Sequence, residues 1–210
     1  MGQMIDSLLT KGKDYTKKDI LISPDEVLRG VFYLKEGYVR MYSISRNGNE
    51  VTINIFKPAS FFPLISVLAD IPNKYYFEVL SKTANLFFVS RNKFLAFAKK
   101  NPKFLFEISK KLLVGLYGQS LRIEALSLGT STERVGLAIL IMTKRFGKKG
   151  KNGIKIQLKL THSELAAMAG VARETVTRQL EKLREEKIID YSRDLIVLTD
   201  QKRLENLLVY

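Results

Sequence analysis

The sequence predicts an α+β fold in which an N-terminal antiparallel β-roll of the jelly-roll type is followed by one long helix and a C-terminal helical unit ending in two short strands. Between about Asp19 and Val89, short segments of alternating polar and apolar residues are separated by turn residues. From Pro102 to about Leu126, apolar residues recur at helical spacing without an interrupting proline. After Gly129, capping and turn residues divide the chain into shorter helices. We therefore expect domain boundaries that give segments 1–101, 102–128 and 129–210.

The β-roll is indicated by strand pairs joined by tight turns. Val31–Leu34 leads through a glycine into Tyr38–Ile44, and Glu50–Phe56 follows the dipeptide Asn47-Gly48. Asn-Gly is typical of a type I′ hairpin, because both central positions of that turn need a positive φ. A further pair is expected at Tyr75–Leu80 and Asn85–Val89. Several strands at this spacing favour a sandwich or a barrel-like roll.

The long helix is preceded by a short one over Asn92–Lys100, which ends at Asn101-Pro102 because proline disfavours helix at the residue before it. About 25 residues make a helix of about 37 Å, longer than a small β-domain covers. We therefore expect its apolar stripe to be a dimer seam, the alternative being a face packed on its own domain. The seam residues are Ile108, Leu112, Gly115, Leu116, Gln119, Ile123 and Leu126.

Residues 129–133 break the long helix and cap the next, which continues to about Lys144. The segment Phe146 to Gly153 is basic and rich in glycine, and we expect a solvated loop, with phosphate contact as the alternative.

A pair of short helices with a tight turn between them follows. Thr161 and Glu164 have the spacing of a capping box, and Gly170 supplies a left-handed turn residue. In the second helix Val176, Leu180 and Leu183 face inward at helical spacing, and two short strands follow within residues 187–198. The pattern is that of a winged helix-turn-helix.

Composition excludes several classes of function. The chain has 210 residues and a formal net charge of +14, with hydrophobic residues at 46%, no Cys and one His. Without cysteine there are no disulfides, thiolate nucleophiles, or cysteine-held zinc or iron–sulfur clusters. No apolar run approaches the ~20 residues of a membrane span, and the first residues do not resemble a signal peptide. We expect a cytoplasmic protein that does not engage a membrane.

The excess of positive charge points first to nucleic acid. It does not locate the site, because it splits into +8 before Gly129 and +6 from Gly129 onward.

The start of the second short helix carries the residues best suited to reading DNA. Arg can bond the O6 and N7 acceptors of guanine, and Glu can accept a hydrogen bond from the N4 amine of cytosine. Hydroxyl and guanidinium donors suit phosphates, which position a protein without specifying sequence, although capping and solvent exposure explain each hydroxyl equally well. The candidate base-reading residues are Arg173, Glu174 and Arg178, and the candidate phosphate contacts are Thr161, Ser163, Thr175, Thr177 and Arg193.

The run Leu165–Leu183, with Arg173-Glu174-Thr175-Val176 within it, resembles the DNA-binding domain of the Crp/Fnr (cyclic-AMP receptor protein) family. The resemblance extends to the whole chain, since the family order is a cyclic-nucleotide-binding-like β-roll, a dimerisation helix and a winged helix-turn-helix. The family's recognition helix commonly carries Arg-Glu-x-x-x-Arg, which matches Arg173, Glu174 and Arg178. The resemblance implies a homodimer that binds double-stranded DNA at palindromic sites with half-sites similar to TGTGA, and it implies RNA polymerase as a further partner.

The sensor half departs from the relatives that bind cyclic AMP, which use a Gly-Glu pair for the ribose and an Arg-Ser or Arg-Thr for the phosphate. Residues 60–79 lack the Gly-Glu pair, and Tyr75 and Tyr76 stand near the expected arginine. Burying a phosphate without a cation is strongly disfavoured, so we expect no tight binding of cyclic AMP. The redox branch of the family needs cysteines, and the haem branch needs ligands in the sensor half, whereas the only histidine is His162. We expect no cofactor and no metal.

An unknown small-molecule effector of apolar or aromatic character is a further hypothesis. Its pocket would be lined by Phe61, Phe62, Tyr75 and Tyr76. The alternative, which the strand spacing favours, is that these aromatic residues fill the roll.

Two other classes of function compete with a sequence-specific regulator. A sensor module could bind nucleic acid only nonspecifically through its lysines, which would give a strong salt dependence without sequence preference. An enzyme is not expected, because no nucleophile and base, phosphate loop or paired-carboxylate motif is visible.

Overall fold

The computed structural model describes residues 5–192 and 195–208. The chain divides into two compact units, residues 1–113 and 114–210, and the boundary falls within helix α4 (Pro102–Leu128). No helix in the described ranges combines the length and the apolar character that crossing a bilayer requires.

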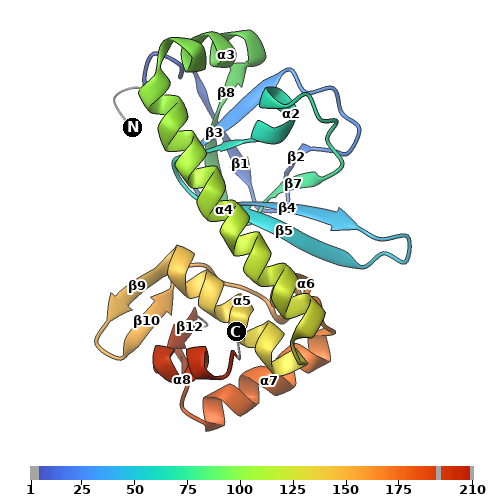
Figure 1. Cartoon of the computed structure of the whole chain (residues 1–210), viewed down its shortest axis with the longest axis vertical. Coiled ribbons are helices and arrows are strands. Elements are labelled where there is room, and N and C mark those ends of the chain that lie inside the picture. The colour runs from blue at the N-terminus through green and yellow to red at the C-terminus, as the bar shows by residue number, and fades with distance from the viewer. Residues whose placement is uncertain (1–4, 193–194, 209–210) are drawn as a thin grey trace. The chain divides into compact units, whose positions relative to one another are not determined.

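The first unit is the antiparallel β-roll that the sequence predicts (Figure 1). In the part of the chain that is described, its strands form two four-stranded sheets, ordered β1-β8-β3-β6 and β2-β7-β4-β5. The strands are β1 (Gly12–Thr16), β2 (Ile20–Ile22), β3 (Gly30–Glu36), β4 (Val39–Ile44), β5 (Glu50–Phe56), β6 (Ser60–Phe62), β7 (Tyr76–Val79) and β8 (Thr83–Ser90), and the helices are α2 (Leu64–Leu68) and α3 (Arg91–Lys100). The predicted strands match to within two residues at each end. The sequence pattern does not reveal β1, β2, β6 or α2, which are all five residues or shorter.

The turn between β4 and β5 differs from the predicted type I′ turn. Gly48 has a φ of +77°, but Asn47 is not in the positive-φ region. The Gly48 N–H donates to the Ser45 carbonyl at 2.9 Å, and the Ser45 N–H donates to the Asn49 carbonyl at 2.9 Å. The loop is one residue longer than a two-residue hairpin, so a single left-handed glycine at its end suffices.

Among the described residues, two hydrophobic cores fill the roll, because successive residues of a strand point to opposite faces. On β3, Val31 and Tyr33 belong to the core that includes Phe94 of α3 and Phe104 of α4. Leu34, on the other face of β3, belongs to the core that takes residues from both sheets.

The second unit contains the predicted helices and the wing. Its helices are α5 (Ser131–Phe146), α6 (His162–Ala169), α7 (Arg173–Glu185) and α8 (Gln201–Asn206). Its strands β9 (Gly147–Gly150), β10 (Gly153–Ile156), β11 (Ile189–Ser192) and β12 (Leu195–Leu198) form an antiparallel sheet of order β11-β12-β10-β9.

The basic segment 146–153 is a hairpin, and the prediction of a loop is wrong. β9 pairs with β10 from Gly147 opposite Ile156 to Gly150 opposite Gly153, and β10 continues the sheet by pairing with β12. Glycine and lysine are poor strand formers, so the local sequence does not predict β9. Pairing with β10, which carries the apolar residues Ile154 and Ile156, explains it.

Candidate nucleic-acid interface

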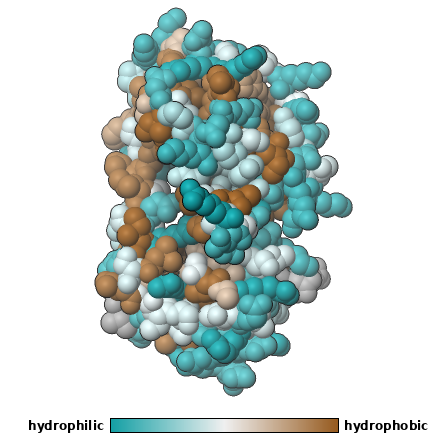
Figure 2. Space-filling model, turned by 90° about the vertical axis from the view of Figure 1, so that its right-hand side faces the viewer, coloured by the Kyte–Doolittle hydropathy of each residue, from teal (hydrophilic) through white to brown (hydrophobic). Residues whose placement is uncertain are grey.

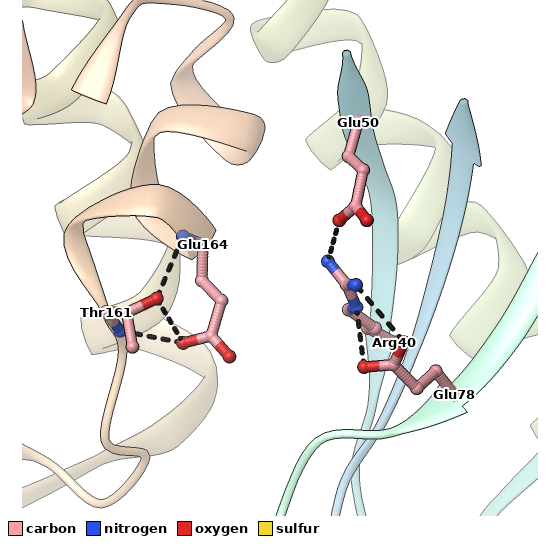
Figure 3. Close-up of polar contacts among 5 residues, drawn as sticks. All are labelled: Arg40, Glu50, Glu78, Thr161 and Glu164. Carbon is pink, nitrogen blue, oxygen red and sulfur yellow. Dashed lines mark hydrogen bonds and ion pairs between the residues drawn. The ribbon is translucent and has the colours of Figure 1, made fainter. Parts of the chain in front are cut away.

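The first helix of the helix-turn-helix, α6, begins and ends as predicted. The Glu164 N–H donates to Thr161 Oγ1 at 3.1 Å, and the Thr161 N–H donates to the Glu164 carboxylate at 2.7 Å (Figure 3). This reciprocal capping box satisfies two N–H groups that the helix itself leaves unpaired. At the other end Gly170 has a φ of +63°, and its N–H donates to the Ala166 carbonyl at 2.9 Å. The capping box and the left-handed glycine therefore define the turn into α7.

The second helix, α7, has one buried and one exposed side. Val176, Leu180 and Leu183 are at most 2% exposed. The three candidate base-reading residues, Arg173, Glu174 and Arg178, are all exposed and lie in its first two turns. Packing of the apolar side thus leaves two guanidinium groups and one carboxylate available to a ligand at the N-terminal end of the helix.

Two polar contacts that the sequence does not reveal position α7. The Thr132 hydroxyl of α5 donates to Gln179 Oε1 at 2.9 Å, and Gln179 is only 7% exposed. His162 Nδ1 of α6 lies 2.8 Å from Thr177 Oγ1. A polar glutamine next to Arg178 gives no sign of burial, and a contact between residues fifteen positions apart has no local signature. These side chains hold α7 against its neighbours and leave its first turn exposed.

The predicted phosphate contacts fall into three groups. The hydroxyl groups of Thr161 and Thr177 already have partners, because Thr161 Oγ1 donates to Glu164 at 3.0 Å and Thr177 Oγ1 donates to the Arg173 carbonyl at 3.2 Å. Ser163 is exposed, and Thr175 is half-buried. Arg193 lies outside the described residues.

The predicted seam on α4 is mostly exposed. Leu112, Leu116 and Ile123 are 46%, 62% and 64% exposed, and apart from the helix backbone itself no atom lies within 4 Å of where a Cβ of Gly115 would be. Figure 2 shows exposed hydrophobic residues as brown patches on a surface that is otherwise largely hydrophilic.

The remaining seam residues are less available. Ile108 is 3% exposed and packs in the first unit's core with Phe104, so the helical period places it on the stripe but its own domain covers it. Gln119 and Leu126 are half-buried.

The four aromatic residues of the hypothetical effector pocket do not line one cavity. Phe61 and Phe62 are neighbours on β6 and therefore point into different cores. Tyr75 packs against the core of Phe62, and Tyr76 stacks on Tyr42 with ring centroids 5.2 Å apart. A cavity of about 470 Å³ does open in this unit, but it is lined by other residues, among them Leu21, Val27, Phe32 and Phe88. The structure favours the alternative that these aromatic residues fill the roll.

A buried arginine in the roll is already neutralised. Arg40, 8% exposed, contacts Glu50 at 2.7 Å and Glu78 at 3.2 Å (Figure 3). Its guanidinium also lies 4.0 Å from the ring centroid of Tyr42. Burial, with a contribution from the charge of Glu78, raises the pKa of Tyr42 to about 12. Because the charge is paired on two sides, Arg40 has little to offer an anionic ligand.

The described residues include no group of three or more His, Asp or Glu that could hold a metal ion.

Comparison with known proteins agrees with this geometry. The family model of the Crp-like helix-turn-helix domain matches residues 128–207, and that of the cyclic nucleotide-binding domain matches residues 12–101. The transcriptional regulator SdrP of Thermus thermophilus is 30% identical over 172 residues, which are 82% of this chain and 80% of that regulator. The global nitrogen regulator of a Nostoc species is 28% identical over 189 residues, covering 88% of this chain and 83% of the relative.

Solved structures show the same similarity. A transcriptional regulator of the CRP/FNR family from Thermus thermophilus superposes with a TM-score of 0.75 at 25% identity, covering 95% of this chain and 99% of that one. These relatives are transcription regulators and not enzymes. With both domains matched in the expected order, the chain belongs to the Crp/Fnr family of helix-turn-helix transcription regulators.

Proposed function

We propose that the protein acts as a homodimer and binds palindromic DNA with half-sites similar to TGTGA. The observation that carries this proposal is the accessible start of α7, where Arg173, Glu174 and Arg178 are free of the helix's buried side. Arg173 and Arg178 would each bond guanine, and Glu174 would accept from cytosine.

Phosphate contacts would hold α7 in register without reading bases. Ser163 and Thr175 are the hydroxyls proposed for this role, together with Arg193. Thr161 and Thr177 would contribute only by exchanging a partner within the chain for a phosphate oxygen, since their hydroxyls are already bonded.

The proposed dimer places the exposed apolar part of α4, with Leu112, Gly115, Leu116 and Ile123, against the same part of a second copy. Support comes from the exposure of these side chains, which a single chain leaves uncovered. The proposed partners are thus DNA, a second copy of the chain and RNA polymerase.

Control by cyclic AMP is not part of this proposal. The roll lacks the Gly-Glu pair, Tyr75 and Tyr76 stand where an arginine would be needed, and the buried Arg40 is bound by two glutamates. A calorimetric titration of the protein with cyclic AMP should show no binding at micromolar concentration; heat that saturates in that range would contradict this part of the proposal.

Selection of bound DNA from a random pool tests the central claim. We expect enrichment of inverted repeats whose half-sites are separated by about 34 Å, one helical turn, since a two-fold dimer reads adjacent major grooves. Strong, salt-sensitive binding without any enriched motif would instead identify a nonspecific nucleic-acid-binding module.

A further inference from the structure

The positive charge of the DNA-binding unit is concentrated away from α7. From Gly129 onward the chain has 16 Lys and Arg against 10 Asp and Glu, and residues 135–163 hold seven of these basic residues and none of the acidic ones. Outside that segment, nine basic residues face ten acidic ones, and α7 itself has four against three. Attraction to DNA grows with the number of phosphates that Lys and Arg neutralise. The nearly neutral α7 is therefore poorly placed to supply it.

Three exposed lysines of the β9–β10 hairpin, Lys148, Lys149 and Lys151, form the centre of this segment, and we call them the hairpin lysines. Others nearby are engaged: Lys144 pairs with Glu205 at 3.6 Å, and Lys155 Nζ donates to Ser192 Oγ at 3.0 Å. Within the described part of the chain, no ion pair involves a hairpin lysine. Their charges face solvent.

The hairpin holds these lysines in a defined place. A Cβ on Gly147 would lie 2.2 Å from the Thr143 carbonyl oxygen, so this strand approaches α5 closely. Gly153 has a φ of +125°, and a Cβ there would lie 2.3 Å from the Leu198 carbonyl oxygen of β12. Glycine is needed at both positions, and the backbone that carries the lysines is therefore fixed against the rest of the unit.

Folding does not explain the choice of lysine. Lys148 lies directly opposite Lys155 in the β9–β10 register, and like charges directly opposite each other destabilise an antiparallel pair. Lysine can protect an edge strand, which applies to Lys148 and Lys149 of β9, but Lys151 lies in the turn beyond the strand. Binding to a polyanion explains three lysines without ion-pair partners at this edge better than a role in folding does.

The hairpin lies at the edge of the sheet farthest from α7. In the sheet order β11-β12-β10-β9, α7 contacts β11 at one edge, and β9 forms the other edge. Three interstrand steps of about 4.8 Å place β9 about 14 Å from β11. Figure 1 shows the hairpin and α7 at separate edges of the second unit. A duplex read by α7 would present the hairpin with different phosphates from those beneath α7.

We propose that the β9–β10 hairpin is a second DNA-contacting element, which binds the phosphate backbone beside the half-site and supplies most of the sequence-independent attraction. The inference rests on the proposed function, in which α7 enters the major groove. In this proposal α7 contacts the bases, and the hairpin contacts the phosphates.

The test compares two charge-matched variants of the full chain. K148Q/K149Q/K151Q neutralises the hairpin lysines, and K99Q/K100Q/K103Q removes the same charge from exposed positions in the first unit. Binding to a random-sequence duplex and to the selected site is measured by fluorescence anisotropy over a range of KCl concentrations. Each lost phosphate contact reduces the magnitude of the slope of log K against log salt by about 0.9. In the hairpin variant the magnitude of this slope should therefore fall by up to about 2.7 per protomer.

We expect the hairpin variant to bind both duplexes at least tenfold more weakly than the wild type at low salt. The ratio of its affinity for the selected site to its affinity for the random duplex should be unchanged. The first-unit variant should keep nearly the wild-type slope. Trimming the base pairs that flank the selected site should weaken the wild type and leave the hairpin variant unaffected.

A hairpin variant that is folded by circular dichroism and keeps the wild-type slope would overturn the inference. So would unchanged DNA binding combined with lost transcription in a reconstituted assay, which would identify the hairpin as a contact for RNA polymerase. Failure of the proposed function looks different: no motif is enriched by the wild type, while the slope on random duplex still falls in the hairpin variant.

Discussion

Arg178 lies on α7 one turn after Glu174, with its side chain free of the helix's apolar side. Replacing it with alanine should cost about 1–3 kcal/mol of binding free energy on the preferred site and relax discrimination at one guanine, because a bidentate base contact is lost. Titration against single-base variants of the selected site measures both effects. Lys182→Ala, an exposed cation further along α7, should leave the base preference unchanged. Equal weakening of Arg178→Ala on every sequence would identify a phosphate contact instead.

Tyr42 gives the roll a dependence on alkaline pH. Burial beside Glu78 raises its pKa from 10.0 to about 12, so the fold favours the protonated phenol. This stabilisation is complete below pH 10 and is lost as the pH rises from 10 to 12. Urea unfolding at intervals across that range should show a falling free energy of unfolding. The fall should be smaller in Tyr42→Phe and unchanged in Tyr117→Phe, because Tyr117 is 67% exposed. Equal curves for all three proteins would contradict the assignment.

The sequence predicts which side chains of α7 are exposed better than it predicts the contacts that hold α7 in place. The exposure of Arg173, Glu174 and Arg178 follows from the period of α7, since three of its four buried positions are apolar. The Thr132–Gln179 and His162–Thr177 contacts join residues 47 and 15 positions apart, and neither pair has a local pattern. Such contacts depend on tertiary packing, which a hydrophobic period does not encode.

At the scale of secondary-structure elements, the turn between α6 and α7 depends on Gly170. Its φ of +63° costs a side-chain-bearing residue about 1–2 kcal/mol, and a Cβ would also lie 2.8 Å from Leu126 Cδ2. Gly170→Ala should therefore lower the free energy of unfolding by about 1–2 kcal/mol, measured by urea denaturation. Gly150→Ala is the control, because the nearest atom to its Cβ would be 3.6 Å away and no positive φ is required. Equal loss in both variants would show that the turn conformation is not the cause.

The elements that the sequence predicts well carry their own boundary residues. α5 and α6 both have capping boxes with glutamate at the third position, and α3 ends where Asn101 precedes a proline. The β9 strand has no such signal, since Gly147–Gly150 contains only glycine and lysine. Its structure comes from pairing with β10, whereas the charge it carries is visible in the sequence alone.

For the whole molecule, helical period alone does not separate a face covered by its own domain from a face covered by a partner. Ile108 and Leu116 lie on the same stripe of α4, yet Ile108 is 3% exposed and Leu116 is 62% exposed. The difference arises because the first unit's core reaches only the N-terminal turns of α4. The part of the stripe that remains uncovered is the part on which the proposed dimer depends.

That dependence can be tested with a charge on the seam. Leu116→Glu would place two carboxylates in an apolar interface between copies, where burial of unpaired charge is strongly unfavourable. We expect the variant to sediment at half the mass of the wild type, and to bind a palindrome no better than an isolated half-site. Val114→Glu is the matched control, since Val114 is 73% exposed and lies roughly 200° around the helix from Leu116. A dimer that survives Leu116→Glu, or one that is lost only in Val114→Glu, would move the interface to another face of α4.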